Sequence, residues 1–258
     1  SRELLDKEQG DLWDSGQVHS DESVHIVYDG KTLITGQKCF WKVRLADEQG
    51  NWTSWSEPAY WQMGLFADDW SAHWIGSAEM ESQSVGGRPV DNKMFDPWFR
   101  KTFTLTESLK EALIYVASIG YHELYVNGCK IGNAVLAPSV TDHKSRARYV
   151  TYDISHYLKK GENVIALWLG TSWAVFPAYQ RNDKPAIPMA LAQAEITLTS
   201  GSKVRVITDG SWKTHASPNV LMGYWDAHHF AGEFYDASLE INGWNEAGFD
   251  DSEWAEAK

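Results

Sequence analysis

The densest group of side chains that could do chemistry lies near the C-terminal end of the sequence: Asp226, His228, His229, Glu233 and Asp236. Carboxylate and imidazole groups serve as metal ligands or as general acids and bases. A zinc site needs two or more suitably spaced His residues, but adjacent residues of a strand point to opposite faces. His228 and His229 could not bind one ion from a strand, so the pattern argues against zinc.

Two of the three acids of this group, Glu233 and Asp236, could also suggest hydrolysis of a glycosidic bond. Such an enzyme needs two carboxyl groups, one on each side of the bond that breaks. Acids in turns next to glycine more often satisfy backbone groups. We therefore favour a buried turn in which Glu233 accepts backbone N–H bonds and Asp236 caps a strand end.

Aromatic side chains offer a second kind of chemistry, because exposed rings stack on the C–H faces of sugars. The chain has 14 Trp and 11 Tyr residues. The candidates are Trp168, Trp173, Phe176, Tyr179 and Trp225. Trp168 falls within an alternating strand pattern and is expected in a core, whereas Trp173 and Tyr179 lie at the start of, or within, an expected loop over residues 174–188.

The elements that must position these residues are almost all strands. Over residues 95–258, β-rich runs alternate with turn residues and few segments have helical periodicity. Residues 121–126 alternate and end at Asn127-Gly128, a strong signal for a type I′ hairpin turn. This pattern predicts a jelly-roll sandwich of the galactose-binding type.

The first part of the chain, residues 1–66, reads as a smaller antiparallel sandwich. Strands are expected at residues 24–28, 39–45 and 60–63, which are too few for a complete seven-stranded domain. Residues 1–5 are expected to form a helix or a loop. The fold class is therefore all-β, a partial fibronectin type III-like sandwich followed, after a connector and long loop over 67–94, by a galactose-binding-like jelly-roll sandwich.

A tryptophan motif in the first domain, Trp52-Thr53-Ser54-Trp55-Ser56, is similar to the WSxWS box of cytokine-receptor fibronectin domains. In that box Trp and Arg side chains stack by cation–π contact. The paired disulfides of such receptors are not expected here, since the two cysteines, Cys39 and Cys129, fall in different domains. We favour a turn at a strand edge whose Trp residues cover the sandwich.

Composition excludes some partners. The formal net charge is -12, which disfavours nucleic acid and anionic membranes as partners. Hydrophobic residues make up 43% of the chain, enough for a packed core, without an apolar run of membrane-spanning length. We expect neither nucleic acid nor a membrane as partner. The compartment stays open between the cytoplasm and the periplasm or cell exterior.

Three blocks, in one order along nearly the whole chain, resemble bacterial alpha-L-rhamnosidases of glycoside hydrolase family 78. The blocks are Leu12-Trp13-Asp14-Ser15-Gly16 with Phe40-Trp41-Lys42, then Leu124-Tyr125-Val126-Asn127-Gly128 with Leu136-Ala137-Pro138, and Gly232-Glu233-Phe234-Tyr235-Asp236-Ala237 with Gly243-Trp244. The resemblance implies a further strand before Ser1. It also implies that the catalytic acid and base lie in a C-terminal α/α toroid, so no catalytic residue is expected in these β domains.

The resemblance further implies a sugar site, because some family members carry a rhamnose-binding module in which calcium bridges protein and sugar. Asn127 falls at the relevant strand end, followed by Gly128 where a member with an Asp-Asn pair would offer two side-chain ligands. Calcium is thus possible at Asn127 and no cofactor is required. The expected carbohydrate-binding residues are Asn127, Trp173, Tyr179 and Trp225.

Several functions remain open at this point. The chain could bind L-rhamnose-containing glycans or shape the substrate entrance of the C-terminal catalytic domain of the same polypeptide. It could instead be a structural spacer that packs on the toroid, an adhesion or receptor-type module, or an accessory domain of another glycosidase.

Overall fold

The computed structural model describes residues 1–79, 95–143, 145–171, 187–222 and 232–258. The chain divides into two compact units, Ser1–Trp70 and Ser71–Lys258. The boundary lies inside the stretch that the sequence assigned to the connector. Each unit is described by itself.

The first unit is a small β structure with one short helix. Helix α1 (Arg2–Asp6) begins the chain, and strands β1 (Lys38–Trp41) and β2 (Ala59–Gln62) pair antiparallel, followed by the 3-10 helix η1 (Ala67–Asp69). The expected helical entry is confirmed, and β1 is shorter than the predicted strand. Cys39 and Leu65 are the buried hydrophobic residues that the described part of this unit contributes.

The strand predicted at residues 24–28 is wrong. This stretch forms no strand, and Val24, Ile26 and Val27 are all exposed. Alternation alone does not make a strand, because each extended segment needs a partner for its N–H and C=O groups. The sequence spacing indicated an extended segment but did not show which strand, if any, would pair with it.

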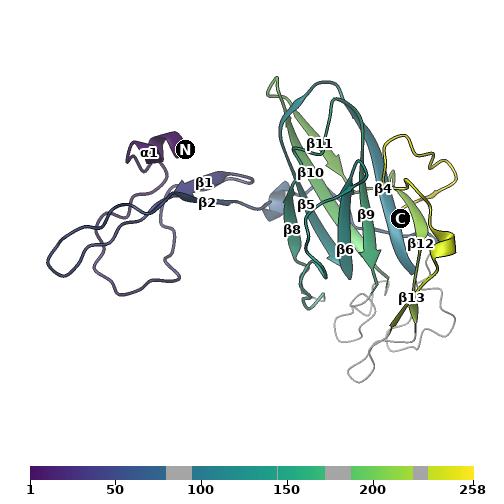
Figure 1. Ribbon diagram of the computed structural model, residues 1–258, viewed down its shortest axis with the longest axis horizontal. Helices are drawn as coiled ribbons and strands as arrows, with labels where there is room; N and C mark the ends of the chain where they lie inside the picture. Colours follow the sequence, from purple (N-terminus) through teal and green to yellow (C-terminus); the bar gives the residue numbers. More distant parts are fainter. Residues whose placement is uncertain (80–94, 144, 172–186, 223–231) are drawn as a thin grey trace. The chain divides into compact units, whose positions relative to one another are not determined.

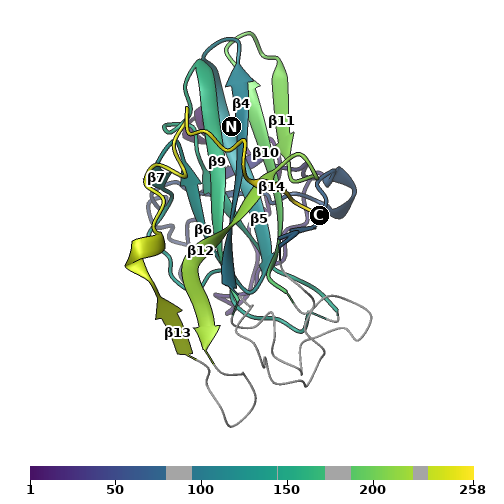
Figure 2. The same cartoon turned by 90° about the vertical axis from the view of Figure 1, so that its right-hand side faces the viewer.

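The second unit is a sandwich of two antiparallel sheets (Figure 1, Figure 2). A five-stranded sheet has the order β11-β10-β5-β8, with β3 also on β10, and a seven-stranded sheet has the order β13-β12-β4-β9-β6-β7, with β14 also on β12. The strands are β3 (Ile75–Gly76), β4 (Phe95–Leu105), β5 (Leu109–Ile119), β6 (Tyr121–Val126), β7 (Cys129–Lys130), β8 (Tyr149–Asp153), β9 (Gly161–Gly170), β10 (Met189–Leu198), β11 (Lys203–Ile207), β12 (Lys213–Met222), β13 (Gly232–Tyr235) and β14 (Ala255–Glu256). The all-β prediction is confirmed.

The main core lies between these two sheets and follows the two-residue period of the strands. Ile165, Leu167 and Leu169 of β9 point inward and are fully buried. Alternate residues of the facing β10, from Ala190 to Ile196, complete the layer from the other side. One face of each strand is thereby removed from water, which is the main source of stability for such a sandwich.

The outer face of the seven-stranded sheet is covered by the C-terminal segment, residues 236–258. Trp98 of β4 stacks between two of its residues, with ring centroids 4.6 Å from Trp244 and 6.3 Å from Trp254. Arg100 of β4 is 1% exposed, pairs with Asp251 and lies over the Phe249 ring. The Gly243-Trp244 pair of the third family-like block therefore serves packing.

Strand β12 was not expected from the sequence. It contains Pro218, which cannot donate a ladder hydrogen bond, and such residues usually mark edges or bulges. The structure places it where the pairing of β12 with β4 shifts register, between Ala216 and Val220. The bulge accommodates the proline, so a strand with a neighbour on each side could include it.

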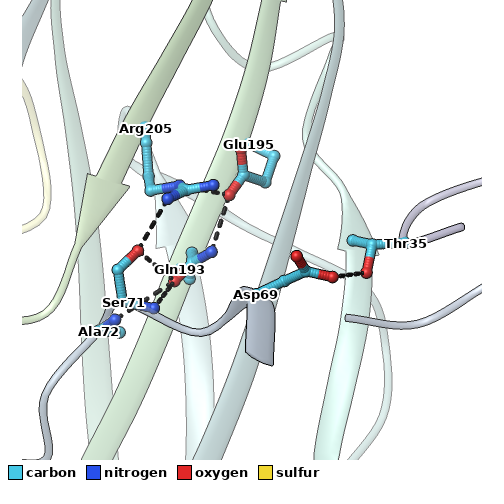
Figure 3. A network of polar contacts seen from close by, with 7 residues as sticks. All are labelled: Thr35, Asp69, Ser71, Ala72, Gln193, Glu195 and Arg205. Atoms are coloured by element: carbon cyan, nitrogen blue, oxygen red, sulfur yellow. Dashed lines mark hydrogen bonds and ion pairs between the residues drawn. The ribbon is translucent and has the colours of Figure 1, made fainter. Parts of the chain in front are cut away.

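A polar network fastens the first residues of the second unit to its five-stranded sheet (Figure 3). The side-chain oxygen of Gln193 on β10 accepts the backbone N–H groups of Ser71 and Ala72 at 2.8 and 3.3 Å. Arg205 of β11 donates to the Ser71 hydroxyl at 2.9 Å and to Glu195 at 2.6 Å. Side-chain hydrogen bonds thus hold the start of the second unit against its five-stranded sheet.

In the described part of the chain, helices are short, and none has the length and apolar character needed to span a bilayer.

Candidate functional site

Asn127 lies in the β6–β7 hairpin, as its position before glycine predicted. Tyr125 pairs with Lys130 and Val126 with Cys129, which leaves Asn127 and Gly128 as the two turn residues. Their φ angles are 49° and 82°, and positive values at both positions are what a type I′ turn requires. The hairpin turn is confirmed.

The Asn127 amide is held by neighbouring strands and loops. Its nitrogen donates to the Tyr157 carbonyl at 2.7 Å and to the Asn163 side-chain oxygen at 2.9 Å. Its oxygen accepts the Val164 N–H at 2.9 Å. Asn163 is fully buried and also holds the backbone of Lys159. The two amides together lock the hairpin onto the start of β9.

These contacts bear on calcium, which prefers six to eight oxygen ligands. The donors of Asn127 are both used, and its oxygen already accepts one hydrogen bond. Among the residues that the structure describes, no group of three or more His, Cys, Asp or Glu is placed to hold a metal ion. One of the two lone pairs of the Asn127 oxygen is thus used within the fold, and calcium at Asn127 stays a prediction.

The other expected sugar-binding residues, Trp173, Tyr179 and Trp225, lie outside the described residues, as does Phe176. The strands that lead to them are described. Strand β9 ends just before the segment 172–186, and β12 leads into the segment 223–231. Trp168 itself is partly buried and packs edge-on against Trp98, as the core prediction implied.

Sheet topology brings the described ends of β9 and β12 to one edge. Strands β9 and β12 both pair antiparallel with β4, on either side of it. They therefore run in the same direction, and their C-terminal ends meet at the edge where β4 begins. Trp173 and Trp225 themselves lie outside the described residues and follow these two strand ends in the sequence.

Asp96, the second residue of β4, is the central polar group of this edge. It is 3% exposed and accepts the Thr171 N–H and hydroxyl, both at 2.6 Å, and the Asn219 amide at 2.5 Å. Burial, with the negative charge of Glu233, raises the pKa of Asp96 to about 6, although its three hydrogen bonds act in the opposite direction. The carboxyl group ties the ends of β9 and β12 to the start of β4.

Sequence reasoning missed Asp96. The available signal was one acid directly before Pro97 and the alternating strand pattern that starts at Trp98. An acid at the start of a strand pattern is ordinarily exposed, so only the meeting of three strands reveals its burial.

A second buried polar group, also not predicted, is centred on His122 of β6. In the sheet order, β6 and the β4 strand of Asp96 lie on the two sides of β9. The His122 ring nitrogens lie 2.9 Å from the Ser118 hydroxyl and 3.0 Å from the Tyr152 hydroxyl. A serine beside histidine can be a nucleophile and its base. Here Ser118 and His122 are buried, and burial lowers the pKa of His122 to about 4. The arrangement is a neutral polar network of the core.

Glu233 and Asp236 of the C-terminal block have different roles in the structure. Glu233 is exposed on β13, opposite Leu221, so the predicted buried turn is wrong. The side chain of Asp236 accepts the Ser238 N–H and caps the 3-10 helix η4 (Ala237–Leu239), which follows β13. Asp236 was expected to cap a strand end; it directly follows β13, but its side chain caps the start of the 3-10 helix instead. Strand β13 has only the β12 neighbour in the described sheet, which is why Glu233 stays in water.

Sequence profiles of two domain families match the chain. Residues 3–67 match the Rha78A-like N-terminal immunoglobulin domain, and residues 107–258 match the alpha-L-rhamnosidase N-terminal domain. The two matches fall on either side of the boundary between the two compact units.

Whole-chain similarity agrees with these matches. An alpha-L-rhamnosidase of Formosa agariphila is 32% identical over 95% of this chain, and one of Alteromonas sp. is 32% identical over 95%. The chain spans only 26% of the length of each of these relatives.

Solved structures show the same relation. The alpha-L-rhamnosidase from Dictyoglumus thermophilum superposes with a TM-score of 0.85 at 35% identity, covering 100% of this chain and 28% of that one. A Streptomyces avermitilis alpha-L-rhamnosidase, solved with L-rhamnose, superposes with a TM-score of 0.84 at 20% identity, covering 100% of this chain and 40% of that one, which supports the fold.

Proposed function

Because this chain belongs to the family of alpha-L-rhamnosidase N-terminal domains, we propose that it is the accessory β region of a longer alpha-L-rhamnosidase. The longer protein would hydrolyse terminal alpha-L-rhamnosyl residues with inversion, using a carboxyl pair in a C-terminal catalytic domain. The chain's span of 26% of its relatives' length leaves room for such a domain in them. The role proposed for the present residues is to bind carbohydrate or to shape the substrate entrance.

The observation that carries the sugar-binding part is the common edge at β4, β9 and β12. Trp173 and Trp225 follow the described ends of β9 and β12 in the sequence, and Asp96 holds these strand ends together. Sugar sites need aromatic rings and polar groups fixed by a rigid scaffold. This edge offers the scaffold, and L-rhamnose-containing glycans are the proposed partners.

Titration calorimetry with L-rhamnose tests this proposal. We expect saturable heat with the unaltered chain, and at least about fivefold weaker binding for Trp173→Ala and Trp225→Ala, since one stacked ring contributes on the order of 1 kcal/mol or more. Trp41→Ala, an exposed residue of the first unit, is the matched control and should bind as the parent does. Absence of heat at millimolar sugar would remove the sugar-binding proposal and leave the accessory role.

The same titration separates the two interpretations of Asn127. With its amide engaged in the hairpin, we expect the heat to persist when a chelator is present. Heat that disappears with chelator, returns with calcium and is abolished by Asn127→Ala would support the calcium prediction instead.

A structural spacer is the second candidate function, and one observation favours it. The first unit exposes many large hydrophobic side chains, among them Val27 at 80% and Leu45 at 66%. A spacer that packs on a neighbouring domain would bury such side chains in the contact. A spacer would give no sugar heat and would melt at higher temperature within the longer protein than alone.

A further inference from the structure

The tryptophan motif of the first unit forms a ladder of alternating cations and aromatic rings. Arg44 lies over the rings of both Trp52 and Trp55, with its guanidinium carbon 4.7 and 4.4 Å from their centroids. The Lys42 ammonium lies 4.8 Å from the Trp55 ring, and the Lys38 ammonium 4.2 Å from the Tyr60 ring. The stacking expected of a WSxWS box is thus present, whereas the expectation that these Trp residues cover a sandwich is not met.

The ladder follows from strand geometry. Lys38, Lys42 and Arg44 are separated by even numbers of residues, so their side chains share one face of an extended segment. Pairing beyond β1 continues through the Ser56 N–H, which donates to the Val43 carbonyl at 2.8 Å, and the bridge between Ala46 and Trp52. The cations of one segment are thereby set against the rings of the other.

This surface is open to solvent and its charges are available. Tyr60 is 59% and Trp52 45% exposed. In the described part of the chain, Lys38, Lys42 and Arg44 form no ion pair with a carboxylate, although the whole chain has a net charge of -12. Glu8 accepts the indole N–H of Trp55 at 3.1 Å, so a carboxylate fits at the edge of one ring.

We propose that this ladder, made of Lys38, Lys42, Arg44, Trp52, Trp55 and Tyr60, binds an acidic polysaccharide built from uronic acid residues. The sugar C–H faces would pack on the exposed rings of Trp52 and Tyr60, on the side of each ring away from its cation, and the carboxylates would pair with the three cations. The two groups of stacked rings and cations, one around Trp52 and Trp55 and one at Tyr60, match a polymer that repeats a ring and a carboxylate.

A polyuronate suits this chain better than a nucleic acid does. Duplex DNA has about one charge per 1.7 Å, a density that an acidic protein repels strongly. A polyuronate has one charge per sugar residue and presents the C–H faces that aromatic rings recognise. The proposal concerns the first unit and does not depend on the sugar site proposed for the second.

Affinity electrophoresis of the full chain in gels containing polygalacturonate tests the proposal. We expect retardation by polygalacturonate, reduced by added salt, and none by neutral dextran. The double variant Lys38→Gln/Lys42→Gln should bind about tenfold more weakly or worse, because two ion pairs are lost. Tyr60→Ser, which removes a ring and no charge, should also weaken binding.

The control is Lys110→Gln/Lys203→Gln, which changes the net charge equally at two exposed lysines of the second unit. It should be retarded as the parent is, and each variant is checked by its thermal unfolding curve. The proposal is overturned by absence of retardation, by equal loss in the control variant, by loss only in variants that no longer unfold cooperatively, or by a single-stranded oligonucleotide competing as well as oligogalacturonate does.

Discussion

At the scale of single residues, Asp96 and His122 respond to pH in opposite directions. Burial raises the pKa of Asp96 from 3.8 to about 6, so the folded state holds a proton that the unfolded state releases. Burial lowers the pKa of His122 from 6.5 to about 4, so the folded state lacks a proton that the unfolded state takes up. The Asp96 contribution to stability is present below about pH 4 and lost as pH rises through 6, while the His122 contribution is lost as pH falls from about 6.5 to 4.

Substituting one of the two residues should leave the pH dependence of stability that the other one causes. For Asp96→Asn, the free energy of unfolding should rise with pH between 4 and 6 more steeply than in the parent. For His122→Gln, the free energy of unfolding relative to that of the parent should fall as pH rises from 4 to 6. Each difference is expected to reach on the order of 2–3 kcal/mol across the window.

Urea unfolding at half-unit pH intervals measures both differences. Parallel curves for the parent and both variants would contradict the account of these two buried groups. Ser118→Ala, which removes a partner of His122 and no titratable group, serves as the control.

How well the sequence predicted these residues depended on how local their causes are. The turn at Asn127-Gly128 follows from two adjacent residues that tolerate positive φ, so the dipeptide predicted it. The burial of Asp96 depends on Thr171 and Asn219, which lie on two other strands. No local pattern contains that information, and the same holds for the His122 network.

At the scale of elements, the C-terminal segment, residues 236–258, covers the outer face of the seven-stranded sheet. Trp244 is 8% exposed and stacks on Trp98, and the buried Arg100 depends on Asp251 for its charge partner. A buried cation that loses its partner is costly. The segment therefore acts as an outer layer of the fold.

Trp244→Ala should destabilise the second unit by about 3 kcal/mol or more, because it removes a large buried ring and leaves a cavity against Trp98. Phe234→Ala, at a residue 52% exposed on β13, should change stability by less than about 0.5 kcal/mol. Urea unfolding followed by far-UV circular dichroism compares them. Equal losses would contradict the role given to the segment.

The alternating pattern predicted some strands correctly, but it failed where a strand contains a bulge or where an extended segment has no partner. Residues 121–126 became β6 without change. Strand β12 was missed because Pro218 needs a bulge, and the run at 24–28 was wrongly predicted because a strand depends on a partner as well as on its own pattern. Both errors arise from pairing between distant segments.

At the scale of the whole molecule, the two units differ in how much core they contain. The second unit has a continuous core between two sheets, while Cys39 and Leu65 are the buried hydrophobic residues of the described part of the first. The all-β class and the family resemblance could be predicted from the sequence. The position of Trp173, Tyr179 and Trp225 could not, and they lie outside the described residues.

The central claim is that this chain is an accessory region whose parent keeps its catalytic carboxyl pair elsewhere. Release of 4-nitrophenol from 4-nitrophenyl alpha-L-rhamnopyranoside by the purified chain tests it most directly, with a full-length relative at equal concentration as the positive control. The account predicts release at the buffer rate for the chain and for Glu233→Gln alike. Turnover by the chain at a rate comparable to the relative, abolished by Glu233→Gln, would contradict it.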